Sequence, residues 1–83
     1  MLRAAGLKTG VPDILIFSQA PNKPEARGIA IELKRVKGGR VSENQHKWLK
    51  DLDNLGWHTA VCKGYSATIK ELEGLGFLKK KGN

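Results

Sequence analysis

Two short apolar runs, separated by a polar loop rich in proline, restrict this chain to a fold that begins with a pair of β-strands. The run DILIFS covers residues 13–18, and GIAIELK covers residues 28–34 with alternating side chains. Both runs are short and rich in β-forming residues, which favours strands over helices. The segment 19–27 between them holds two of the three prolines, so we expect a loop that joins the strands in an antiparallel pair.

A helix is predicted next, because Ser42 and Gln45 have the spacing of a capping box. In that motif each residue binds the backbone of the other and stabilises the start of the helix. Gly56 is placed to end the helix. Between these limits the apolar residues recur at helical spacing: Trp48, Leu49, Leu52 and Leu55.

The remaining chain predicts a third strand, WHTAVC at 57–62, and a second helix at 67–75. Ser66 is the expected cap of that helix and Gly76 its expected end. The order is then β-β-α-β-α, in which the first helix crosses over and pairs the second and third strands in parallel. We therefore predict an α/β fold with a mixed sheet flanked by helices.

The chain is short enough to form one domain, which we place at residues 1–83. A single cysteine excludes an intrachain disulfide. No apolar run approaches the roughly 20 residues needed to cross a membrane, and residues 1–8 lack the apolar core of a signal peptide. We expect an intracellular protein without a membrane partner.

Asp13 stands at the entrance of the first predicted strand, and Glu32 lies 19 positions further on, late in the second. Antiparallel pairing would bring the two carboxylates level at one end of the sheet. Glu32 and Lys34 share one face of their strand, because side chains alternate along it. Such a pair is often a plain solvated edge. On a central strand, however, uncompensated burial of charge costs several kcal/mol, so the pair needs a partner or a role.

The two carboxylates and the backbone carbonyl of Leu33 form a set of hard oxygen ligands. Such a set suits Mg²⁺ or Mn²⁺, with water and phosphate oxygens in the remaining positions. Lys34 beside the cation is suited to orient an attacking water or to stabilise charge that develops on phosphorus. These residues therefore predict metal-assisted hydrolysis of a phosphodiester bond.

Pro12-Asp13 followed by Glu32-x-Lys34 is similar to the PD-(D/E)xK nuclease signature. The flanking segments carry a more specific likeness to the VRR-NUC (virus-type replication-repair nuclease) domain, over about residues 6–70. These segments are GLKTGVPDILIF, GIAIELKR, GGRVSENQHKWLKDLDNLGW and AVCKGYSATI. The resemblance implies a restriction-endonuclease-like core with metal-dependent nuclease activity.

The resemblance also implies roles for four candidate catalytic residues. Asp13 and Glu32 would be metal ligands, Lys34 the catalytic lysine, and Gln45 a helical glutamine that supports the active site. The sequence departs from the family in one respect. Members usually carry a helix before the Pro-Asp motif, often with a further acidic residue, whereas no acid precedes Asp13 here.

Gln45 has two readings that compete for one side chain. In the capping box it stabilises the helix start by about 1 kcal/mol. In the active site it would direct its amide toward a metal-bound water. We expect that it cannot satisfy both roles fully, and the resemblance favours the site.

The chain carries 15 Lys and Arg against 8 Asp and Glu, and this net charge of +7 favours a polyanionic partner such as nucleic acid. Basic residues on three segments flank the proposed site, and Gly38-Gly39 would let their loop approach a phosphate backbone closely. The alternative is a solvated turn without a ligand. The proposed DNA-binding residues are Lys8, Arg35, Lys37, Arg40 and Lys47.

Five further residues have a less specific signal. His46 and His58 lack the spacing of metal ligands, so we expect them at the surface or at a strand end. Trp48 fits a core position better than a base-stacking platform, and Cys62 fits a small buried residue. Tyr65, at a turn after Gly64, is either simply exposed or in contact with DNA or a partner.

We therefore expect a structure-selective DNA endonuclease that depends on Mg²⁺ or Mn²⁺. The alternative is a catalytically silent nucleic-acid-binding or assembly module on the same fold. The complete set of Asp13, Glu32 and Lys34 favours the nuclease. A restriction-type enzyme that reads sequence is less favoured, because no segment forms a subdomain for base edges.

A homodimer is the expected working form. A sheet of three strands leaves exposed edges, which proteins usually cover. The apolar residues Trp48, Trp57, Phe77 and Leu78 exceed what one small core can bury. The resemblance implies the same assembly, since stand-alone viral members look like dimeric resolvases of four-way (Holliday-type) junctions. It also places the protein in the cytoplasm of a bacterial host, if a phage or bacterium encodes it.

Overall fold

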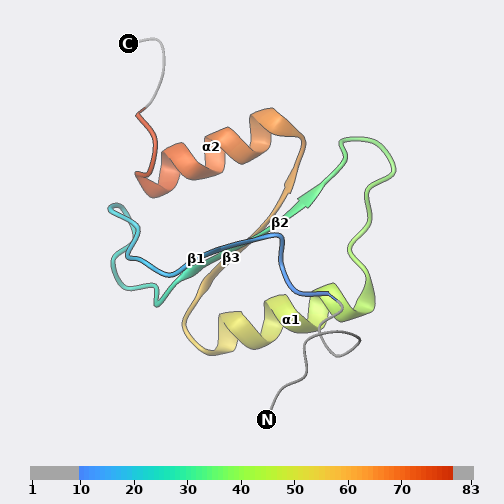
Figure 1. Cartoon of the computed structure of the whole chain (residues 1–83), viewed down its shortest axis with the longest axis horizontal. Helices are drawn as coiled ribbons and strands as arrows, with labels where there is room; N and C mark the ends of the chain where they lie inside the picture. The colour runs from blue at the N-terminus through green and yellow to red at the C-terminus, as the bar shows by residue number, and fades with distance from the viewer. Residues whose placement is uncertain (1–9, 80–83) are drawn as a thin grey trace.

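The computed structural model describes residues 10–79, and its secondary structure has the predicted order β-β-α-β-α (Figure 1). The elements are β1 (Ile14–Ile16), β2 (Ile29–Lys34), α1 (Glu43–Asn54), β3 (His58–Lys63) and α2 (Tyr65–Leu75). β1 pairs antiparallel with β2, and β3 pairs parallel with β2, so the sheet is mixed with the order β1-β2-β3. The predicted α/β class is confirmed.

β1 is shorter than the predicted strand at 13–18. Its register pairs Ile14 with Ile31 and Ile16 with Ile29, the first residue of β2. Phe17 would therefore face Gly28, where β2 has not yet begun, and the chain leaves the sheet there. β3 is displaced by one residue from the predicted strand at 57–62 and ends at Lys63.

The two helices cover opposite faces of the sheet (Figure 1). Beneath α2, apolar side chains from β2, β3, α2 and the loop after β1 form the buried core: Ala20, Ala26, Ile29, Ile31, Cys62 and Leu75. Burial of an Ile or Leu side chain of this kind contributes roughly 1.5–3 kcal/mol to stability. Beneath α1 lie the other side chains of β2, including Ala30 and Glu32, together with Leu49 from the helix.

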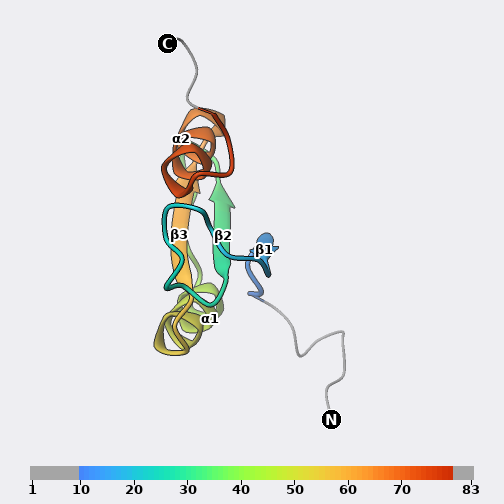
Figure 2. The ribbon, with the colours of Figure 1, turned by 90° about the vertical axis from the view of Figure 1, so that its left-hand side faces the viewer.

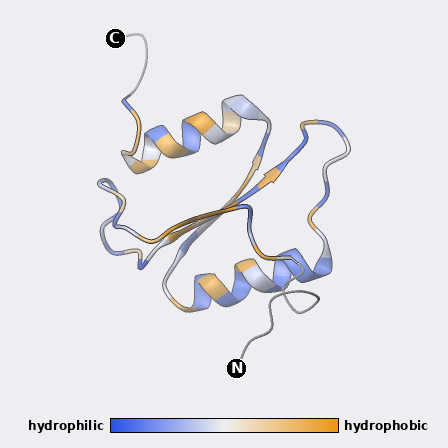
Figure 3. Cartoon of the chain, viewed as in Figure 1, coloured by the Kyte–Doolittle hydropathy of each residue, from blue (hydrophilic) through white to orange (hydrophobic). Residues whose placement is uncertain are grey.

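β1 extends beyond the cover of both helices (Figure 2). Leu15 and Phe17 are exposed, Phe17 to 77% of its surface. The edge of the Phe17 ring meets Trp57, with ring centroids 5.4 Å apart. Hydrophobic residues run along β1, whereas α1 is mostly hydrophilic on its surface (Figure 3). Among residues 10–79, nothing pairs with the outer edge of β1.

The capping box of α1 is confirmed, and the predicted cap of α2 is wrong. Ser42 caps α1, and Gly56 follows it with φ 97°. α2 begins two residues earlier than predicted, at Tyr65, after Gly64 with φ 90°, and no side chain caps it. Because Gly64 turns the chain straight out of β3, Ser66 already lies inside the helix. Gly76 ends α2 in the left-handed conformation, as predicted.

The burial of other predicted core residues varies. Cys62 is buried, as predicted, and its burial raises the pKa of the thiol. Trp48 is half-buried rather than inside the core. Leu33 is 40% exposed, because β1 begins only opposite Ile31 and leaves the end of β2 uncovered. Within the described residues, neither helix is long and apolar enough to cross a membrane.

Candidate active site

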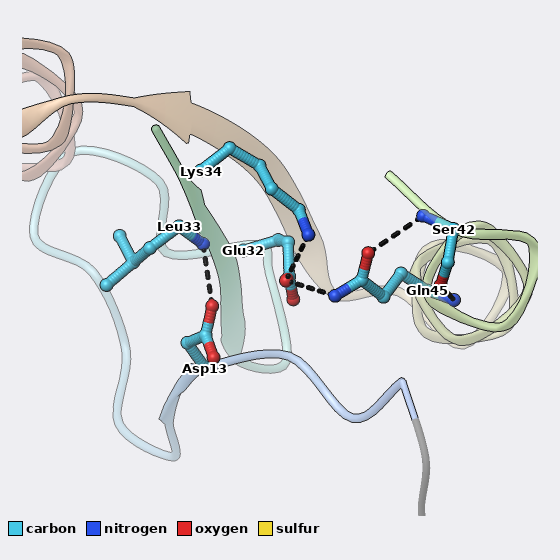
Figure 4. A network of polar contacts seen from close by, with 6 residues as sticks. All are labelled: Asp13, Glu32, Leu33, Lys34, Ser42 and Gln45. Atoms are coloured by element: carbon cyan, nitrogen blue, oxygen red, sulfur yellow. Dashed lines mark hydrogen bonds and ion pairs between the residues drawn. The ribbon is translucent and has the colours of Figure 1, made fainter. Parts of the chain in front are cut away.

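Asp13 and Glu32 meet at the end of the sheet where β1 begins. Ile14 pairs with Ile31, so the same antiparallel register places Asp13 opposite Glu32. An Asp13 carboxylate oxygen accepts a hydrogen bond of 2.9 Å from the backbone N–H of Leu33 (Figure 4). This bond ties the residue before β1 to the end of β2. The two carboxylates are therefore level, as the sequence predicts.

Glu32 is the centre of a polar network on the face beneath α1 (Figure 4). Its side chain is only 2% exposed. Its Oε2 atom accepts a 2.6 Å hydrogen bond from Gln45 Nε2 and lies 3.4 Å from Lys34 Nζ. Its Oε1 atom is buried without a hydrogen-bond partner, which no other side-chain atom of the described residues shows. Such an atom is costly unless something else satisfies it.

The pKa of the Glu32 carboxyl lies above its ordinary value. The main cause is burial, which disfavours the charged form, and the next is the negative charge of Asp13. Lys34 opposes the rise through its hydrogen bond and its positive charge. A cation between the two carboxylates would remove the repulsion and favour the ionised form.

Lys34 and Leu33 lie at the end of β2 with their backbones turned to opposite sides. The Lys34 carbonyl accepts a 2.9 Å hydrogen bond from Gly64, at the end of β3. The N–H of Leu33 points instead to Asp13. Because the N–H and C=O of one strand residue point the same way, the Leu33 carbonyl also faces the Asp13 side. The carbonyl proposed as a third oxygen ligand therefore lies on the same side of β2 as Asp13.

Gln45 completes the capping box and also contacts Glu32, so the cap does not keep its amide away from the candidate site. Its Oε1 atom accepts a 2.8 Å hydrogen bond from the N–H of Ser42, which completes the capping box. Its Nε2 atom donates to Glu32. An amide has an acceptor and a donor at its two ends, and here each end has one role. The helix cap thereby orients the group that holds Glu32.

Gly10 is a positioning residue that sequence reasoning missed. Its φ is 92°, and a Cβ atom added to it would lie 2.7 Å from the backbone carbonyl carbon of Asn44. Only glycine therefore lets the segment before Asp13 cross the first turn of α1 so closely. The signal in the sequence is the glycine three residues before Asp13 in TGVPD.

The predicted DNA-binding residues are exposed where the structure describes them. Arg35, Lys37 and Arg40 lie in the turn after β2, and Lys47 lies on α1. Lys8 falls outside the described residues. Lys63 was not predicted, but its pairing with Lys34 in the β2–β3 register adds another exposed cation at the same end of the sheet.

The two histidines lie apart from this site. His46 is exposed on α1. His58 lies at the opposite end of β3 from Lys63, and its Nε2 atom is 2.6 Å from the Glu71 carboxylate on α2. The sequence contains no signal for this pair, because the two residues are 13 positions apart on different elements.

The ligand set fits a hard divalent cation that keeps several water ligands. Among residues 10–79, no three side chains of His, Cys, Asp and Glu cluster in the manner of a closed metal cage. The two carboxylates and the Leu33 carbonyl instead form an open, partial set. Mg²⁺ commonly binds with one or two carboxylates and completes its shell with water and phosphate oxygens. The unpartnered Oε1 of Glu32 is the atom that such an ion would satisfy.

Comparison with known protein families identifies a family for this chain. The family model of the VRR-NUC domain matches residues 2–66, which is more than half of the chain and includes all four candidate catalytic residues. No curated protein matches the chain, and no solved structure matches it.

Proposed function

The chain belongs to the VRR-NUC domain family of nucleases, and on this premise we propose that it is a metal-dependent, structure-selective DNA endonuclease. The observation that carries the proposal is the buried, unpartnered Oε1 of Glu32 opposite Asp13. A retired site would have no reason to keep an unsatisfied carboxylate oxygen beside a second carboxylate, since the arrangement is unfavourable without a cation.

Asp13, Glu32 and the Leu33 carbonyl would hold Mg²⁺ or Mn²⁺. When bound, the ion supplies Lewis-acid chemistry, which polarises a phosphoryl oxygen and lowers the pKa of water. The bond from Leu33 N–H to Asp13 and the bond from Gln45 to Glu32 restrain both carboxylates before any ion arrives. This preorganisation reduces the entropy lost on binding.

Lys34 has the position of an electrostatic catalyst. Its ammonium lies 3.4 Å from Glu32, with 16% of its side chain exposed, so it is mostly removed from water. A charge in such surroundings acts strongly on a neighbouring phosphate. Lys34 would stabilise the negative charge that develops on phosphorus, or orient the attacking water. Gln45 would act through Glu32 as a positioning residue.

We further propose four-way junctions as the substrate and a homodimer as the working form. The outer edge of β1 and the exposed Leu15 and Phe17 leave a surface that a second copy could cover. Two sites related by a two-fold axis would face the two strands of a symmetric junction. The exposed basic residues Arg35, Lys37, Arg40 and Lys47 would hold the phosphate backbone without reading sequence.

The test is a cleavage assay on labelled four-way junctions, flaps, hairpins and paired duplex, with Mg²⁺, with Mn²⁺ or with EDTA. We expect paired nicks in opposite strands of the junction, only with metal. Binding without cleavage in any metal would favour the alternative, a catalytically silent nucleic-acid-binding or assembly module. Light scattering at micromolar concentration tests the dimer, and a monomer mass with undiminished junction cleavage would rule it out.

A further inference from the structure

An apolar hollow of about 280 Å³ opens beside the candidate active site, at the ends of β2 and β3. Its lining is almost wholly apolar and consists of Leu33, Lys34, Cys62, Gly64, Tyr65 and Thr68. Leu33 and Cys62 lie on the α2 side of the sheet and Glu32 on the α1 side, and Lys34 connects the two, since it lines the hollow while its ammonium contacts Glu32. A group bound in the hollow would therefore lie across the end of β2 from the carboxylates.

Tyr65 forms one side of the hollow and is 81% exposed, the largest exposed fraction among the large apolar and aromatic side chains described. Within residues 10–79, its hydroxyl has no hydrogen-bond partner and its ring has no aromatic partner. The fold therefore does not use this ring for stability. A large aromatic side chain left free beside a hollow is available to an outside ligand.

The backbone holds Tyr65 in place without help from its ring. The preceding residue, Gly64, donates a 2.9 Å hydrogen bond to the Lys34 carbonyl. Thr68 Oγ1 donates a 2.9 Å bond to the Gly64 carbonyl. Gly64 has φ 90°, and a Cβ atom there would lie 2.5 Å from Cγ2 of Val36, so the basic turn packs directly on this residue. Tyr65 is thus fixed relative to Lys34.

The charges around the hollow indicate which kind of ligand it can bind. The two segments that border it, 33–42 and 61–70, contain six Lys and Arg, and the nearest acids, Glu32 and Glu71, lie one residue outside them, so positive charge is in excess. An apolar protein surface would gain nothing from these cations. A nucleic acid would, because its phosphates pair with the cations while its bases offer flat apolar faces.

We propose that the hollow takes an unpaired nucleobase of the DNA substrate and that Tyr65 stacks on it. This inference rests on the proposed nuclease function and deepens it, because it names the feature of branched DNA that the site selects. Bases in a continuous duplex are paired and stacked, so only a base that is unpaired at a flap or splayed end, or that opens at the branch point of a junction, can enter. Tyr65 would then be a specificity-determining residue of the same site.

The experiment compares the full chain with Tyr65→Ala and Tyr65→Phe. Two labelled DNAs of equal length are used, one fully paired and one with a splayed, unpaired end, and affinity is measured by fluorescence anisotropy in EDTA. Tyr65→Ala should weaken binding of the splayed DNA by roughly tenfold while binding of the duplex changes little, as expected for loss of one stacked base. Tyr65→Phe should keep the wild-type affinity, because a phenyl ring also stacks.

Leu55→Ala is the matched control, since Leu55 is a large apolar residue, 63% exposed, at the far end of α1. It should bind both DNAs as the wild type does, and thermal melts should show all variants folded. Equal losses for Tyr65→Ala on both DNAs, or no loss on either, would overturn the inference. A lower mass of the assembly in solution for Tyr65→Ala than for the wild type would overturn it too, because the surface around Tyr65 would then bind a second copy of the chain.

Cleavage separates this inference from the function it rests on. If the wild type cuts branched DNA and Tyr65→Ala discriminates splayed from paired DNA as the wild type does, the inference fails and the nuclease stands. If the wild type cuts no DNA with Mg²⁺ or Mn²⁺, the proposed function fails instead.

Discussion

The two faces of β2 serve different purposes. Ile29 and Ile31 point beneath α2 into a closed apolar core with no exposed surface. Glu32, between them and the end of the strand, points beneath α1 and is just as buried, at 2% exposure, yet its surroundings are polar and incompletely satisfied. Burial of apolar side chains on one face stabilises the fold, whereas burial of the Glu32 carboxylate on the other face costs stability. Because side chains alternate along the strand, neighbouring residues of β2 belong to an apolar core and to a buried polar network.

The largest effect should follow from substitutions on the polar face. Asp13→Ala, Glu32→Ala and Lys34→Ala should each reduce the rate of junction cleavage by about a thousandfold or more. DNA binding should survive, because the carboxylates repel phosphate and Lys34 acts mainly on charge that develops during the reaction. The measurements are single-turnover cleavage with Mg²⁺ and anisotropy in EDTA.

Matched controls for these three variants lie on exposed positions elsewhere. They are Asp53→Ala and Lys50→Ala on α1 and Glu25→Ala in the loop after β1, all of which are exposed. These controls should cut as the wild type does. A variant of Asp13, Glu32 or Lys34 with a near-normal rate would remove that residue from the active site.

On the apolar face the effect should be on stability alone. Ile31→Ala should lower the free energy of unfolding by about 2–5 kcal/mol, because Ile31 is fully buried and its loss leaves a cavity. Urea denaturation measures this. Leu55→Ala, at a position 63% exposed, should stay within about 0.5 kcal/mol of the parent. A stability loss for Glu32→Ala as large as that for Ile31→Ala would contradict the contrast between the faces.

The cap of α1 allows stability and chemistry to be separated within one motif. Ser42→Ala removes the acceptor for the Gln45 N–H and should cost about 1 kcal/mol. Cleavage should persist, because the Ser42 N–H still binds Gln45 Oε1. Gln45→Glu keeps the cap but breaks the contact with Glu32. A carboxylate can still accept from Ser42, but it cannot donate to Glu32 and repels it, so cleavage should fall, and stability should fall too because a buried carboxylate loses its donor. Equal effects of both variants on cleavage would contradict this division.

The smallest effect concerns Glu32→Gln in the metal-free protein, because Lys34 already offsets part of the cost of burying Glu32. Burial, and then the charge of Asp13, raise the pKa of Glu32 in the folded state. The folded state therefore binds a proton more readily than the unfolded state, and stability falls as pH rises through that raised pKa. The Glu32→Gln protein has no ionisable group at this position, so it does not lose stability in this way.

Glu32→Gln should accordingly be more stable than the parent at neutral pH, and the difference should vanish once the pH is below the ordinary pKa of a Glu carboxyl. Thermal melts across this pH range in EDTA measure it, with Glu43→Gln as the control at an exposed position of α1. Added Mg²⁺ should then stabilise the parent and not Glu32→Gln, since an ion that binds only the folded state raises its stability. Stabilisation of both proteins by Mg²⁺ would place the ion elsewhere.

The sequence by itself determined the features that are encoded within a few residues of each other. The capping box needs only Ser42 and Gln45, and the alternation in residues 28–34 assigns each side chain to a face. The strand order and the level placement of Asp13 and Glu32 follow from the loop between them and from the single crossover helix. These predictions hold because local geometry leaves few alternatives.

Only the tertiary structure decided how closely distant segments approach one another. The sequence shows that Glu32 is charged but not that α1 buries it and leaves Oε1 unpartnered. The glycine at position 10 is visible in the sequence, but its close crossing over Asn44 is not, and no signal exists for the His58–Glu71 pair. Each of these depends on how helices and strands pack, a balance of many contacts spread over the whole chain, which no short motif encodes. The residues of the candidate site are therefore recognisable in the sequence. The burial of Glu32, its raised pKa and the hollow lined by Lys34 and Tyr65 arise from packing.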